Sequence, residues 1–230
     1  DAGGKASKII STGTINMDGD ASLDRRNFAA WAEGANSEVV LADGVVNLNG
    51  DGAIGVHSRD AGKITVEQGA INFFSGEDQI GFFAYGKDAN GKASTIDIKS
   101  SSAAGLEVAT VGSTLFRVED GAAINNQAGT KLIASGERST ALQVTGVDST
   151  INLDSADITV SGDGATALKL EGGATGQMSG AAKLTLRDGT TAVVVDNTKY
   201  DLAPAPVKMS GTVHYDGQTI PDTYGSSYQE

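Results

Sequence analysis

Apolar side chains recur along this chain in short alternating triplets that return at a regular spacing. In each triplet the first and third residues are apolar, and the triplets begin at Phe28, Ile54, Ile80, Phe116, Leu142, Leu168 and Val193. Most of these starting residues are 26 positions apart, and the last step is 25. Apolar residues that alternate with a period of two are typical of β-strands. Each triplet therefore predicts one strand of a repeating unit.

Two further apolar triplets lie between successive starting residues, for example Ile64/Val66 and Ile71/Phe73. Segments such as NGDG and SGDG supply glycine and Asx residues for the turns. A unit of three short strands cannot bury its own apolar face, so the units must stack. The sequence predicts an all-β fold, a right-handed parallel β-helix solenoid with three strands per coil, about 26 residues per coil and seven to eight coils.

The spacing also predicts the boundaries of the repeats. Coils are expected over residues 1–203, and residues 204–230 are expected to form an irregular last coil or a truncated boundary. The step from Ile80 to Phe116 is 36 residues, which predicts a ten-residue insertion within residues 87–113. Inserted loops in solenoids often lie on the binding face, although a tolerated loop with no role is the alternative. A helix over residues 24–33 is a second interpretation of the segment that contains Phe28.

Composition and charge exclude several classes of function. The net charge of −12 argues against binding to nucleic acid, and no apolar run is long enough for a membrane-spanning helix. The absence of cysteine excludes disulfides and thiol catalysis. The two histidines form no catalytic or metal-binding motif, and Leu23 and Ala29 stand where an EF-hand needs glycine and glutamate. We therefore expect no enzyme, no cofactor and no metal site; a weak calcium site at residues 18–24 and a carbohydrate-active enzyme are the less favoured alternatives.

The residues that follow the first triplets are candidates for a binding surface. If the triplets point inward, this column faces solvent and consists of Trp31, His57, Phe83, Glu119, Thr145, Glu171 and Asp196. Phe74 and Tyr85 are expected beside its aromatic part, and Asp88, Asn90 and Lys92 in the predicted insertion. An exposed aromatic strip is typical of a surface that binds protein or sugar. The alternative is that the rings pack on each other or beneath loops.

Two stretches carry a resemblance to a known family. GAINFFSGEDQIGFFAYG and STINLDSADITVSGDGATALKL each combine an apolar–Asn–apolar strand, a turn and a further apolar triplet. This pattern covers about residues 13–200 and resembles the pertactin-like β-helix passenger domains of Gram-negative autotransporters. The resemblance implies export across the outer membrane, display on the bacterial cell surface and a role in adhesion. The implied partners are a host surface protein or glycan, or a second copy by self-association; a structural stalk with its function elsewhere is the alternative.

Overall fold

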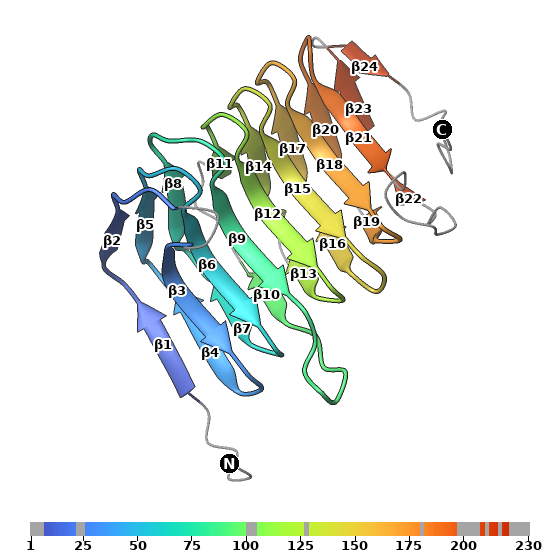
Figure 1. The fold of residues 1–230 in the computed structure, drawn as a ribbon. Coiled ribbons are helices and arrows are strands. Elements are labelled where there is room, and N and C mark those ends of the chain that lie inside the picture. The colour runs from blue at the N-terminus through green and yellow to red at the C-terminus, as the bar shows by residue number, and fades with distance from the viewer. Residues whose placement is uncertain are drawn as a thin grey trace.

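The computed structural model describes residues 7–21, 26–99, 105–126, 129–179, 182–196, 208–209, 212–215 and 218–220. These residues form β-strands and no helix, and the strands stack in parallel as a solenoid of about seven turns (Figure 1). Equivalent residues of most successive coils are about 26 positions apart, as the pairing of His57 with Phe83 shows. The predicted all-β solenoid with three strands per coil is confirmed.

The first sheet has seven strands, which pair in parallel along the solenoid. They are β3 (Phe28–Glu33), β6 (Ile54–Arg59), β9 (Ile80–Tyr85), β12 (Thr114–Glu119), β15 (Thr140–Thr145), β18 (Thr166–Glu171) and β21 (Thr191–Asp196). Because β3 pairs with β6, the helical interpretation of this segment is wrong over the six residues of that strand.

The second sheet runs beside the first and has eight parallel strands. They are β1 (Ser7–Ser11), β4 (Ser37–Leu41), β7 (Lys63–Val66), β10 (Thr95–Ile98), β13 (Ala123–Asn126), β16 (Thr150–Asp154), β19 (Thr175–Ser179) and β22 (Lys208–Met209).

The third face is divided into two sheets. The shorter one contains β2 (Thr14–Met17), β5 (Val45–Leu48) and β8 (Ala70–Phe73). The longer one contains β11 (Leu106–Val108), β14 (Lys131–Ala134), β17 (Asp157–Val160), β20 (Lys183–Leu186), β23 (Thr212–Tyr215) and β24 (Gln218–Ile220), the last of which pairs antiparallel with β23. The division between β8 and β11 falls in the coil that carries the insertion.

The core lies between the three faces and contains one apolar cluster that extends along the solenoid. We number the positions of each first-sheet strand from 1 to 6. Positions 2 and 3 both enter the cluster, as Leu115 and Phe116 do, so the side chains do not alternate there. The residues at position 2 are not paired between neighbouring strands. At position 5 the side chain again points into the core, as Val118 does in β12. The strand therefore changes direction between positions 2 and 3, and positions 4 and 6 face outward.

This register corrects the predicted alignment of the coils. Thr114, not Phe116, pairs with Ile80, and Phe116 pairs with Phe82. Ile80 is nearly fully buried, but it lies at position 1 and does not belong to the central cluster. Ile80–Phe82 and Phe116–Val118 look alike as apolar triplets, but they occupy different positions of their strands, so the apolar pattern alone aligns them wrongly.

The insertion is shorter than predicted and lies mainly at one corner. The coil from Ile80 to Thr114 spans 34 residues, which is eight more than a 26-residue repeat and not ten. Nine residues, 86–94, join β9 to β10, whereas three, 60–62, join β6 to β7. Lys87 and Ala93 form an antiparallel bridge, and the resulting hairpin projects beyond the neighbouring turns (Figure 1).

Candidate functional site

Aromatic rings stack across three coils on the outer face of the first sheet. Trp31, His57 and Phe83 pair in register at position 4, and Phe28 lies beside the first two. The ring centroids of Trp31 and His57 are 5.1 Å apart, and those of His57 and Phe83 are 4.7 Å apart. We call these four residues the aromatic column. Because parallel strands lie about 4.8 Å apart, the spacing of the rings follows that of the coils.

Exposure differs strongly along the aromatic column. His57 is only 5% exposed because rings lie on both sides of it, whereas Trp31 is 43% exposed. The Nδ1 atom of His57 lies 3.2 Å from the carbonyl oxygen of Phe83, a hydrogen-bonding distance. Burial lowers the pKa of His57 below its ordinary value and outweighs this hydrogen bond, which raises it. The imidazole is therefore neutral at pH 7, and Trp31 offers the column's most exposed ring.

Three charged or polar residues and one valine follow the aromatic column at position 4 of the C-terminal coils. Position 4 is occupied there by Arg117, Gln143, Lys169 and Val194. The guanidinium of Arg117 lies 5.4 Å from the centre of the Phe83 ring, which is a cation–π distance. Its Nε atom also donates a hydrogen bond of 2.6 Å to Glu119. Position 4 is therefore aromatic in β3, β6 and β9, charged or polar in β12, β15 and β18, and apolar in β21.

The acidic half of the predicted column is wrong. Glu119, Thr145, Glu171 and Asp196 lie at position 6, together with Tyr85, and not in line with Phe83. Sequence reasoning missed Arg117 for the same reason. The sequence does contain a signal for the true register. FRV at residues 116–118 aligns with FFA at residues 82–84, two residues after Ile80, if the insertion has eight residues and not ten.

Tyr85 and Phe74 have different relations to the aromatic column. The rings of Tyr85 and Phe83 are 6.1 Å apart, so Tyr85 extends the aromatic surface sideways. A hydrogen bond to Asp120 raises the pKa of the Tyr85 hydroxyl. Phe74 follows β8 and is 66% exposed, and within the described residues it makes no ring contact with the column. The structure therefore unites Trp31, His57, Phe83 and Tyr85, but not Phe74.

The hairpin between β9 and β10 holds the remaining candidate residues. One carboxylate oxygen of Asp88 accepts hydrogen bonds of 2.9 Å from the backbone amides of Asn90 and Lys92. The hydrogen bond from Lys92 is the main cause of the lowered pKa of Asp88. Lys87 reaches across the corner to Asp148 at 3.0 Å. Asp88 therefore stabilises the hairpin through hydrogen bonds within it, and the side chain of Lys92 is exposed at its surface.

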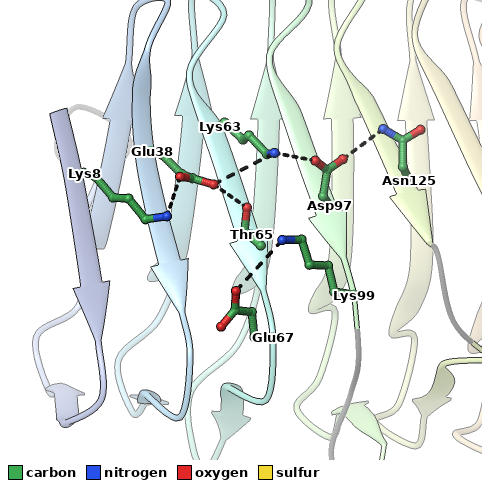
Figure 2. Close-up of polar contacts among 8 residues, drawn as sticks. All are labelled: Lys8, Glu38, Lys63, Thr65, Glu67, Asp97, Lys99 and Asn125. Atoms are coloured by element: carbon green, nitrogen blue, oxygen red, sulfur yellow. Dashed lines mark hydrogen bonds and ion pairs between the residues drawn. The ribbon is translucent and has the colours of Figure 1, made fainter. Parts of the chain in front are cut away.

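A chain of polar contacts crosses the outer face of the second sheet (Figure 2). Lys8 lies 3.0 Å from Glu38, and Lys63 lies 3.9 Å from Glu38 and 2.9 Å from Asp97. Asp97 accepts a hydrogen bond of 3.1 Å from Asn125. Lys8, Glu38 and Lys63 pair in register, although they are far apart in the sequence. The ion pairs of this chain of contacts were not predicted from the sequence; matching charged side chains at the same position of successive repeats would have found them.

The described residues offer no arrangement typical of a metal site. They contain no group of three His, Cys, Asp or Glu side chains placed to hold an ion. Asp18 accepts a hydrogen bond of 2.6 Å from Asn49, and Asp20 accepts one of 3.0 Å from the backbone amide of Asp51. The rest of the calcium site considered above, residues 22–24, lies outside the described residues.

No helix in the described part of the chain could span a membrane. Comparison of the sequence with protein-family models and with curated proteins, and of the fold with solved structures, gives no match.

Proposed function

We propose that this chain is part of a passenger domain displayed on a Gram-negative cell surface, and that it acts in adhesion by binding a partner through the aromatic column. The fold supports this proposal, because stacked parallel coils with a 26-residue repeat suit a long extracellular solenoid. The partner would be a host surface protein or glycan, or another copy of the chain.

The exposure of Trp31 on a preformed stack of rings is the observation that carries the proposal. Phe28 and His57 support the Trp31 ring from within the protein, at 4.9 Å and 5.1 Å. Tryptophan, tyrosine and arginine dominate the binding energy of many protein interfaces. A side chain that is already ordered loses little conformational entropy when it binds a partner. Trp31, Tyr85 and Arg117 are therefore suited to anchor a ligand on this face.

The test is binding of the purified chain to cultured host cells and to an immobilised glycan panel. We expect saturable binding by the parent and a loss of at least about tenfold in affinity in a Trp31→Ser/Phe83→Ser variant, since truncation of aromatic anchors is costly. Phe74→Ser is the matched control, because Phe74 is an exposed ring outside the aromatic column. The double variant must show a cooperative thermal transition before its binding is interpreted.

Three other results would contradict the proposal. Equal binding by the parent and the folded double variant would exclude the aromatic column, and an equal loss in Phe74→Ser would point to non-specific adhesion of exposed rings. Saturable self-association that the double variant abolished would instead support the proposal and identify a second copy of the chain as the partner. No binding by the parent to any target would favour the stalk.

A further inference from the structure

The second sheet has a shallow hollow of about 300 Å³ on its outer face, next to the hairpin. The strands β1, β4, β7 and β10 form its floor, and the hairpin contributes Lys92 and Ala93 to its edge. This volume is at the lower end of the range that small-ligand pockets occupy, roughly 300–1,000 Å³. The insertion therefore contributes Lys92 and Ala93 to the edge of this hollow.

Lysines outnumber carboxylates in the lining of the hollow. Its charged lining residues are Lys8, Lys63, Lys92 and Glu38. Lys8 forms an ion pair with Glu38 and Lys63 forms one with Asp97, so Lys92 is the one lysine of this lining for which the described residues show no ion pair. Polar groups that can hydrogen-bond a hydroxylated ligand surround these charges: Ser7, Asn36, Ser37 and Thr95.

Contacts within the protein hold most of these side chains in place. Burial raises the pKa of the Glu38 carboxyl, but the hydrogen bond from Thr65 and the proximity of Lys8 lower it by more, so Glu38 is ionised at pH 7. Ionised Glu38 lies 3.0 Å from Lys8 and 3.9 Å from Lys63, and Asp97 lies 2.9 Å from Lys63 (Figure 2). In contrast, no ion pair is formed by Lys92 within the described residues. Its charge interacts with the Asp88 carboxylate of the same hairpin without forming an ion pair, so the ammonium can still contact a ligand.

We propose that this hollow binds the anionic group of an acidic saccharide, a sulfate ester or a carboxylate, with Lys92 as the principal cation. Lys8 and Lys63, which are paired with Glu38 and Asp97, also line the hollow. The hydroxyl and amide side chains accept or donate hydrogen bonds to the sugar. Lysine binds such anions as a point charge without demanding one geometry. The hollow lies on a different sheet from the aromatic column, so this site goes beyond the adhesive face proposed above.

Two substitutions with opposite expected effects test the site. Lys92→Ala removes a positive charge and should weaken binding by about fivefold or more, whereas Glu38→Gln removes the opposing negative charge and should strengthen it by a similar factor. Lys183→Ala is the matched control, because Lys183 is an exposed lysine on β20 for which the described residues show no ion pair. Its affinity should stay within about twofold of the parent, as expected for a distant charge.

The probes are a sulfated heparin tetrasaccharide, its desulfated form and a hyaluronan oligosaccharide of similar length, titrated by calorimetry and by amide NMR at low salt and at 150 mM salt. We expect the charged saccharides to bind, the affinity to fall with salt, and the amide shifts to centre on β1, β4 and the hairpin. The relative affinities of the sulfated probe and hyaluronan distinguish sulfate from carboxylate.

Equal affinities for the parent and Lys92→Ala, or weaker binding by Glu38→Gln with the fold intact, would overturn the assignment. So would preferential binding of a glutamate-rich peptide, which would assign the hollow to acidic protein segments. Because the Trp31→Ser/Phe83→Ser variant leaves the hollow intact, it should keep the parent's saccharide affinity. The two proposals can therefore fail separately.

Discussion

The imidazole of His57 packs against the ring of Phe83 at 4.7 Å and lies 3.2 Å, through Nδ1, from the carbonyl oxygen of the same residue. The two residues are 26 positions apart and pair directly across β6 and β9. A titratable group is therefore buried in the middle of the surface that we propose to bind a partner.

Stability should depend on pH through His57. Its pKa is lowered in the folded state by burial, so below the ordinary pKa of 6.5 the unfolded chain binds a proton that the folded chain does not. Stability is therefore greatest above pH 6.5 and is lost as the pH falls from there toward the folded-state pKa. The measurement is the free energy of unfolding in urea from pH 7.5 to 5.5, for the parent and for His57→Phe.

In His57→Phe the free energy of unfolding should depend less on pH than in the parent, because phenylalanine fills the same place in the stack without titrating. Identical slopes for the two proteins across this pH range would show that His57 is protonated equally in both states.

The sequence alone predicted the repeat, the three strands per coil and the all-β class, because each depends on apolar periodicity. It did not predict the register after the insertion, since Ile80–Phe82 and Phe116–Val118 are equally good alternating triplets. Glycine at position 2 hid the fact that this position faces the core. Gly55 and Gly81 occupy the position that Leu115 occupies in β12, and because glycine has no apolar side chain, nothing in the sequence indicated burial there.

The candidate site was predicted in part. The aromatic residues of the column were found because they follow apolar triplets at the 26-residue step. The burial of His57 was not, because it depends on rings from two neighbouring coils. The placement of Phe74 at the corner after β8, away from the column, depends on the turn and not on the periodicity of the strand.

Gly81 should tolerate no side chain. A Cβ at this position would lie 2.9 Å from the carbonyl oxygen of Leu115 and 3.1 Å from the ring of Phe73. Gly81→Ala should destabilise the protein by about 1–3 kcal/mol, as overpacking of a core usually does. Gly13→Ala is the control, because no atom lies within 4 Å of the added carbon. Chemical denaturation compares the two, and a Gly81→Ala midpoint equal to that of Gly13→Ala would contradict the packing.

Ser58 should be replaceable with a gain in stability. It occupies core-facing position 5 of β6, and its hydroxyl is buried with no hydrogen-bond partner among the described residues. Its strand neighbours at this position are Ala32 and Ala84. Ser58→Ala should stabilise the protein by about 1 kcal/mol, because an unsatisfied buried hydroxyl is removed. The thermal midpoint measures this change, and a lower midpoint would show that Ser58 has a partner after all.

Leu142 should be among the costliest residues to truncate. It is fully buried at position 3 of β15, between Phe116 and Leu168 of the adjoining strands. Leu142→Ala should cost about 2–5 kcal/mol through lost contacts and the remaining cavity. Thr159→Ala, on the outer face of β17, should change stability by about 0.5 kcal/mol or less. Similar losses for the two variants in urea titrations would mean that Leu142 is not in the core.

The hairpin should be removable without loss of the fold. The amide of Ser94 donates a hydrogen bond of 3.0 Å to the carbonyl oxygen of Gly86, so the two ends are adjacent. An Asn-Gly link in place of residues 87–93 can therefore close the corner as a two-residue turn. The deletion removes the exposed Lys87–Asp148 ion pair, which contributes about 1 kcal/mol at most. The thermal midpoint should fall by no more than about 4 °C.

Binding by this shortened protein separates the two faces of the solenoid. Because Lys92 is absent, affinity for the sulfated or carboxylated saccharide should fall at least as much as in Lys92→Ala. The aromatic column lies on the first sheet and keeps all its ring contacts, so binding to the cellular target should persist. If cell binding were lost along with the hairpin while the fold remained intact, adhesion would depend on the insertion and not on Trp31 and Phe83. Parallel titrations of the parent, the shortened protein and Lys92→Ala decide between these results.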